Sequence, residues 1–152
     1  MPTSTESPRL LIPRPILAAM LAQAAEELPN ECCGLLGGSR SADGRLLHAR
    51  TVHPLVNAAG SPTAYESEPR SMFDAMRELR QSDLDVVAIY HSHPSSPPVP
   101  SRSDLAQSWG EGVVNLIISL QSAQPEVRGW WLTATDYREA GWECVDAAGE
   151  SL

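Results

Sequence analysis

Two segments of the chain carry apolar residues at the spacing of an α-helix. These segments are residues 15–28 and 70–81, where apolar side chains recur every three or four positions. Pro29 follows the first segment and Pro69 precedes the second, as expected for the end of one helix and the beginning of another. The positions that define the period are Ile16, Leu17, Met20, Leu21 and Ala24 in the first segment and Met72, Phe73, Met76 and Leu79 in the second.

Short apolar runs elsewhere in the chain indicate buried β-strands. The clearest are residues 84–93 and 113–120, which are rich in Val and Ile. Weaker strand patterns cover residues 10–13, 32–38, 45–52, 127–135 and 141–145, and a third helix is predicted over 101–109. Helices and strands mix without a strict βαβ repeat. This order predicts an α/β fold of the mixed α+β kind, a sandwich in which helices flank a mixed central β-sheet.

The length and composition of the chain fit a single domain. Of its 152 residues, 42% are hydrophobic, which is enough for one core. We expect that domain to span residues 9–147, with disordered segments at 1–8 and 148–152. The first residues lack the features of a signal peptide, and no apolar run reaches the roughly 18 residues of a membrane span. A cytoplasmic protein is therefore expected.

An excess of acidic residues narrows the choice of partners. The 19 acidic and 11 basic residues give a net charge of −8, and every basic residue is Arg. Nucleic acids and anionic membranes do not attract such a surface, so neither is an expected partner. Because the chain has no Lys, catalysis by a lysine amine or Schiff base is excluded.

Several cysteine, histidine and tryptophan residues are explained by packing or by exposure at the surface. Cys32 and Cys33 are adjacent, so in a strand they would point to opposite faces and pack as small apolar groups. His48 and His53 are expected to be polar surface residues, not ligands. The four tryptophans can form a binding surface, although core packing explains most of them; they are Trp109, Trp130, Trp131 and Trp142.

Residues 91–104 contain a pattern typical of a catalytic zinc site. His91 and His93 stand two apart at the end of a predicted strand, so both imidazoles project from the same face. Asp104 falls in the first turn of the next helix, and a short loop can bring it back toward the strand end. Two imidazoles and one carboxylate suit zinc, and three protein ligands leave a fourth position for water. We therefore predict one Zn²⁺ per chain with a bound water.

Each half of this pattern also has a simpler interpretation. Two histidines on one face of a strand are often only exposed polar residues. Residues 101–104 also match a helix capping box, in which Ser101 is the N-cap and Asp104 stands three residues later. Neither interpretation explains why the two patterns occur together, joined by a proline-rich turn. Capping and metal binding are also compatible, because one carboxylate oxygen can serve each.

Together with Glu31, these residues resemble the complete JAMM motif of the MPN-domain metalloproteases. The motif comprises Glu31, the sequence HSHP at 91–94 and the pattern S-x-x-D at 101–104, with seven residues between His93 and Ser101. Identity and spacing agree at every motif position. The resemblance covers nearly the whole chain and implies the MPN fold, a cytidine-deaminase-like sandwich.

The resemblance also implies a role for each residue of the motif. His91, His93 and Asp104 correspond to the zinc ligands, and Glu31 corresponds to the general acid and base that activates the zinc-bound water. Ser101 corresponds to the hydroxyl that helps to hold the tetrahedral intermediate. The implied reaction is hydrolysis of an amide or isopeptide bond at the C-terminal glycine of a ubiquitin-like or sulfur-carrier protein that ends in Gly-Gly.

The choice of substrate remains open among members of this family. The chain is short and is similar to the compact prokaryotic branch, and residues 57–65 (NAAGSPTAY) resemble a sulfur-carrier cysteine peptidase of that branch. A deconjugating enzyme for a prokaryotic ubiquitin-like protein is an alternative, as are RadC-like and phage-tail relatives. A non-catalytic MPN interaction module is a further alternative. A structural zinc domain is disfavoured because the motif supplies only three protein ligands.

Overall fold

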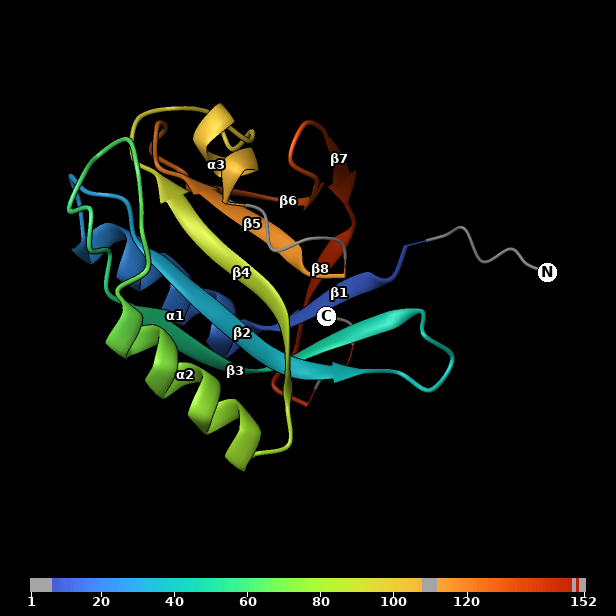
Figure 1. The fold of residues 1–152 in the computed structure, drawn as a ribbon. Helices are drawn as coiled ribbons and strands as arrows, with labels where there is room; N and C mark the ends of the chain where they lie inside the picture. The colour runs from blue at the N-terminus through green and yellow to red at the C-terminus, as the bar shows by residue number, and fades with distance from the viewer. Residues whose placement is uncertain (1–6, 108–111, 149, 151–152) are drawn as a thin grey trace.

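One mixed β-sheet with helices on both faces forms the body of the protein (Figure 1). The computed structural model describes residues 7–107, 112–148 and 150. The strands are β1 (Arg9–Pro13), β2 (Cys33–Arg40), β3 (Leu46–Leu55), β4 (Asp85–His93), β5 (Val114–Ser119), β6 (Glu126–Leu132), β7 (Tyr137–Ala140) and β8 (Trp142–Val145). The helices are α1 (Arg14–Glu26), α2 (Pro69–Gln81) and α3 (Arg102–Ala106).

The sheet has the strand order β7-β6-β5-β4-β2-β3-β1-β8, with β4 near its middle. β4 runs parallel to β5 and antiparallel to β2, and β1 runs parallel to both β3 and β8. These mixed pairings confirm the predicted α+β fold with a mixed central sheet. The register places Cys33, at the start of β2, beside His91, near the end of β4. The residues just before β2 therefore lie next to the last residues of β4.

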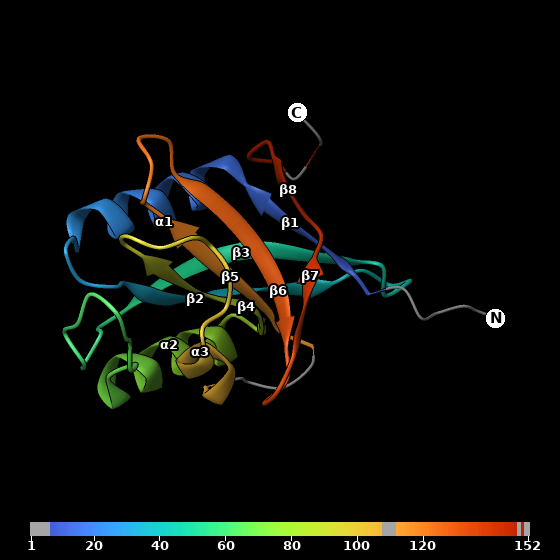
Figure 2. The same cartoon turned by 90° about the horizontal axis from the view of Figure 1, so that it is seen from above.

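The two faces of the sheet carry separate apolar clusters. Figure 2 shows α1 on one face and both α2 and α3 on the other. Met20 of α1 belongs to the first cluster and Leu79 of α2 to the second. Cys32 packs in the first cluster and Cys33 in the second, as predicted. Burial raises the pKa of these thiols to about 11 and about 12, so both stay protonated at neutral pH.

Strand β7 has no counterpart among the predicted strands. Three of its four residues are exposed, so no alternation of apolar and polar positions marks it in the sequence. Its place depends on pairing with β6 and on a bidentate ion pair between Arg128 and Glu139, with both nitrogen–oxygen distances at 2.9 Å. The strand predicted over 127–135 ends at Leu132, where the chain turns into β7.

Several predicted segments extend beyond the described residues. The helix predicted over 101–109 ends at Ala106 within the described part, and positions 108 and 109 lie outside it. Most of the predicted terminal segments, 1–8 and 148–152, also lie outside, so their disorder stays a prediction. Among the described residues, no helix has the length and apolar character needed to cross a membrane.

The tryptophans that the structure describes pack in the core, as predicted. Trp130 and Trp131 are 5% and 7% exposed and face opposite sides of β6, where they join different apolar clusters. Trp142 is half-buried and packs against the cluster on the α1 face. Trp109 lies outside the described residues.

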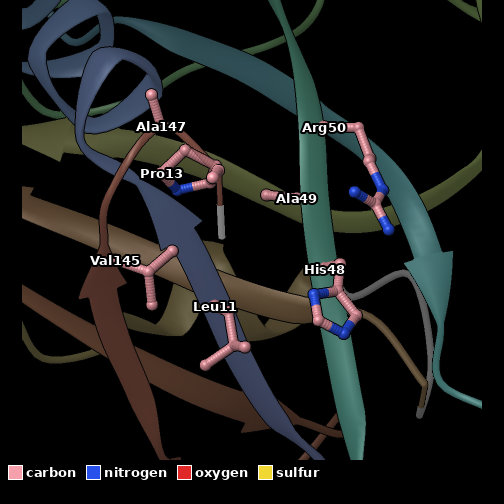
Figure 3. A pocket seen from close by; sticks show the side chains of 8 residues that line it. Leu11, Pro13, His48, Ala49, Arg50, Val145 and Ala147 are labelled. Atoms are coloured by element: carbon pink, nitrogen blue, oxygen red, sulfur yellow. The ribbon is translucent and has the colours of Figure 1, made fainter. Parts of the chain in front are cut away.

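The two histidines expected at the surface differ in their surroundings. His48 is half-buried and lines a hollow of about 110 Å³ formed by β1, β3 and the end of β8 (Figure 3). For His53, the prediction of a surface residue is wrong. Its side chain is 10% exposed, with Nδ1 3.1 Å from Glu78 Oε1 and Nε2 2.8 Å from Thr51 Oγ1, so it links β3 to α2.

Candidate metal centre and active site

The three predicted metal ligands converge at the carboxyl end of β4. His91 Nε2 lies 3.1 Å from His93 Nε2 and 3.1 Å from Asp104 Oδ1. The second carboxylate oxygen, Oδ2, lies 3.1 Å from His93 Nε2. All three side chains are buried, and their ligand atoms lie within 4.8 Å of one another. The loop between β4 and α3 therefore brings Asp104 back to the strand end, as the sequence predicts.

The hydrogen bonds around this group fix which atoms point inward. His93 Nδ1 lies 2.8 Å from the Pro97 carbonyl oxygen, which can only accept, so Nδ1 donates and Nε2 is left as the ligand atom. Ser101 and Asp104 form the predicted capping box: Asp104 N donates to Ser101 Oγ, and Ser101 N donates to Asp104 Oδ2. Capping and convergence on the histidines thus occur together.

The electrostatics of the group favour positive charge between the three side chains. Burial alone would raise the pKa of Asp104, but hydrogen bonds from His91 and His93 hold it well below its usual range. Burial alone would lower the pKa of His93, yet bonds to Asp104 and to the Pro97 carbonyl raise it. A buried carboxylate that stays ionised beside two imidazole nitrogens is suited to holding a cation.

Glu31 lies beside this group with an unpaired carboxylate oxygen. The residue is 4% exposed, and its Oε1 has no hydrogen-bond partner among the described residues. Burial raises the pKa of Glu31 to about 7, with a lowering contribution from His93 and a raising one from Asp104. A buried polar atom without a partner is uncommon in a folded protein, and it indicates that a bound species pairs with this oxygen.

Backbone contacts from two directions hold Glu31 in place. On one side, Cys32 N donates to Ser92 Oγ at 2.8 Å and Ser92 N donates to the Cys32 carbonyl at 3.1 Å, so Ser92 ties the residue after Glu31 to the strand end. On the other side, Glu31 N donates to the Ser61 carbonyl at 2.8 Å. Asn57 Nδ2 donates to the Glu31 carbonyl at 2.9 Å. The sequence pattern gave no indication of these roles for Ser92 and Asn57.

Asn57 organises the loop of residues 56–68, which forms a wall of the site. Its amide nitrogen also donates to the Ala64 carbonyl, and its Oδ1 accepts from Ala59 N and Glu66 N at 3.0 and 2.9 Å. In the same loop, Tyr65 stacks on His91 with ring centroids 4.6 Å apart. The loop thereby connects the candidate general base to a candidate ligand.

Replacing Asn57 with Ala is expected to lower the free energy of unfolding by about 1–3 kcal/mol, because the Glu31 and Ala64 carbonyls each lose a partner. Chemical denaturation measures this change, and hydrogen exchange at Ala59 N and Glu66 N should become faster. A substitution of the exposed Gln124 with Ala provides the control and should change stability by less than about 0.5 kcal/mol. Equal effects of the two substitutions would contradict this role for Asn57.

Ser101 has an exposed side chain at the edge of the site. Its Oγ accepts from Asp104 N and lies 3.1 Å from Ser103 Oγ. The cap uses this oxygen only as an acceptor, and either hydroxyl can be the donor in the bond with Ser103, so the Ser101 proton is available when Ser103 donates. Its proposed contact with a reaction intermediate stays a prediction.

A buried His-His-Asp group next to an unpaired carboxylate, at the end of a central strand, is the arrangement of a metallopeptidase site. Residues 13–133 match the family model of prokaryotic homologues of the JAB domain. The chain belongs to this family. The predicted JAMM-type metallopeptidase is therefore confirmed at the level of the family.

Known relatives and structures agree with this assignment. The desampylase of Pyrococcus furiosus is 34% identical over 137 residues, which are 88% of this chain and 91% of the relative. The CysO-cysteine peptidase of Mycobacterium tuberculosis is 34% identical over 96 residues, or 63% of each chain. A solution structure of a protein from Desulfitobacterium hafniense has a TM-score of 0.80 at 30% identity and covers 90% of this chain and 93% of that one.

Proposed function

We propose that this protein is a zinc-dependent peptidase that hydrolyses an amide or isopeptide bond at the C-terminal glycine of a ubiquitin-like or sulfur-carrier protein ending in Gly-Gly. The observation that carries the proposal is the convergence of His91, His93 and Asp104 beside the unpaired carboxylate of Glu31. A non-catalytic interaction module would need neither the buried ligand set nor the unpaired oxygen.

The donor set suits zinc better than a hard cation. Imidazole nitrogens and one carboxylate are ligands that zinc accepts, whereas Mg²⁺ and Ca²⁺ prefer oxygen ligands throughout. Three protein ligands leave one coordination position open, as in catalytic zinc sites. When bound, zinc supplies Lewis acidity, which acidifies water and polarises a carbonyl oxygen.

The residues of the chain supply the proton transfers. Glu31 takes a proton from the attacking water at its unpaired Oε1 and gives it to the nitrogen of the leaving amine. Burial raises the pKa of this carboxyl to about 7 in the metal-free protein, and a bound cation would lower it, which would favour the ionised form that takes the proton. The Ser101 hydroxyl donates a hydrogen bond to the oxygen that gains negative charge.

The named relatives support a carrier protein as the substrate. The desampylase matches this chain over nearly its full length, while the CysO-cysteine peptidase matches over a shorter part of both chains. Removal of a carrier from a conjugate is therefore better supported than release of cysteine. The cytoplasmic location stays a prediction.

Metal analysis of purified protein tests the proposal first. We expect one zinc per chain in the wild type and its loss in His91→Ala and Asp104→Ala, because each variant leaves only two ligands. His48→Ala alters a histidine of β3 that lines the hollow beside β1 and β8; this variant should keep its zinc and serves as the control. Absence of zinc after reconstitution would contradict the proposal and leave an interaction module.

The substrate is tested with two forms of one Gly-Gly carrier. In one form a short peptide extends the C-terminal glycine, and in the other a lysine side chain is joined to it through an isopeptide bond. Faster cleavage of the isopeptide form supports deconjugation, and faster release of the peptide supports processing of a carrier tail. Cleavage of neither form by zinc-loaded protein would overturn the Gly-Gly specificity.

A further inference from the structure

The segment of residues 94–100 is held by side chains from three different strands. Ser119 Oγ of β5 donates to the Ser96 carbonyl at 2.6 Å. Trp130 Nε1 of β6 donates to the Pro98 carbonyl at 2.9 Å. Between these two carbonyls, the Pro97 carbonyl accepts the bond from His93 Nδ1 of β4. Three consecutive carbonyls are therefore fixed from the side of the sheet.

This segment depends on such contacts because of its composition. Four of its seven residues are proline, at positions 94, 97, 98 and 100, so few backbone N–H groups remain to form internal hydrogen bonds. Side-chain donors take their place. Val99 of the segment and Leu105 of α3 also pack on the buried cluster that contains Trp130. The position of α3, and with it Asp104, thus depends on the same surface of β5 and β6.

The Trp130 ring is itself fixed on the remaining sides. Tyr137 of β7 meets it edge to face, with ring centroids 5.3 Å apart and an interplanar angle of 86°. The Arg128 guanidinium lies over the ring, 4.6 Å from its centroid, and is bonded to Glu139. A ring held in this way presents its N–H to Pro98 in one orientation.

We propose that Trp130 is a positioning residue of the metal site, which acts through the Pro98 carbonyl. By fixing the segment at Pro98, it holds the adjacent Pro97 carbonyl against His93 Nδ1 and sets the path of the chain to Asp104. The indole N–H contributes this function in addition to the apolar burial of the ring. The inference rests on the proposed function, since it assigns Trp130 a role toward the zinc that His91, His93 and Asp104 would hold.

Two adjacent tryptophans allow a matched test. Trp130→Phe keeps an aromatic ring and removes the N–H, and Trp131→Phe makes the same change one residue later. Trp131 is equally buried, but it belongs to the cluster on the α1 face, and its ring contact is with Arg138. Both substitutions remove similar apolar contacts, whereas only the first removes a bond to the metal-site segment.

Zinc affinity, measured by competition with a chelator, should fall about 10-fold in Trp130→Phe. This is the lower end of the effect seen when a residue that orients the metal ligands, without binding the metal itself, is replaced. It should change less than twofold in Trp131→Phe. The visible spectrum of the Co²⁺-substituted protein should change in the first variant and match the wild type in the second. Thermal unfolding of both metal-free variants records the loss that comes from packing alone.

Ser119→Ala provides a second variant, which removes the hydrogen bond to the Ser96 carbonyl without altering an aromatic ring. It should weaken zinc binding in the same direction as Trp130→Phe. Equal zinc affinities in Trp130→Phe, Trp131→Phe and the wild type would overturn the inference. If Trp130→Phe does not fold, the test passes to Ser119→Ala, and a zinc affinity equal to that of the wild type in this variant would overturn the inference. Failure of the wild type to bind zinc would instead overturn the proposed function, so the two failures are distinguishable.

Discussion

Glu31→Gln is expected to keep its zinc and to lose about 10²–10⁴-fold in kcat. Glutamine has nearly the same shape as glutamate, so the backbone bonds that hold position 31 to Ser61 and Asn57 are retained. The amide cannot take a proton from water or return it to the leaving amine. The loss should therefore appear in kcat, with metal content unchanged.

This result is measured with zinc analysis and with steady-state cleavage of a Gly-Gly carrier. Glu26→Gln, a change at the exposed end of α1, is the control and should retain the wild-type rate. Wild-type turnover by Glu31→Gln would remove Glu31 from the mechanism. Loss of zinc from this variant would indicate that Glu31 serves as a ligand and would change the proposed ligand set.

Elements with strong local signals were predicted from the sequence to within a few residues. The second helix was predicted at 70–81 and begins one residue earlier in the structure, at Pro69. Its first turn is fixed by Glu68, whose side chain accepts from Ser71 N and Arg70 N. Such caps, prolines and apolar periods act between neighbours in the chain, and this is why a single sequence reveals them.

The metal ligands were predictable for the same reason. His91, His93 and Asp104 lie within 14 residues, and strand alternation together with one short loop is enough to bring them together. Glu31 lies 60 residues from His91, and only the family resemblance connected the two. Their proximity depends on the antiparallel register of β2 and β4, which the local pattern does not contain.

The supporting residues also depend on contacts between parts of the chain that are distant in sequence. Asn57 reaches Glu31 across 26 positions and Trp130 reaches Pro98 across 32, in each case through a side chain that bonds a carbonyl. A carbonyl has no sequence signature, so a bond of this kind cannot be inferred from residue types. Strand β7 was missed likewise, because its contacts with Trp130 and Arg128 hold it in place more than any apolar pattern of its own.

In zinc-free protein, Glu31→Gln is expected to become more stable than the wild type as the pH rises. Burial raises the pKa of Glu31 from 4.5 to about 7, so the folded state keeps a proton that the unfolded chain releases. Between these two values the folded protein binds more protons than the unfolded chain. Its free energy of unfolding therefore falls with increasing pH, by about 3 kcal/mol in total. Glutamine does not titrate and avoids this loss.

Urea unfolding of both zinc-free proteins across pH 4 to 8 measures the effect as a difference. His91, His93 and Asp104 are present in both proteins, so only the part of their titration that depends on the charge of Glu31, as for His93, remains in the difference. The variant should gain about 3 kcal/mol over the wild type between pH 4 and pH 8, and most of the gain should appear between pH 4.5 and 7. Saturating zinc should reduce the gain, because a cation near Glu31 favours the ionised carboxylate. A difference that stays constant across this range would contradict the prediction. It would mean that the pKa of Glu31 is the same in the folded protein as in the unfolded chain, so burial would not raise it.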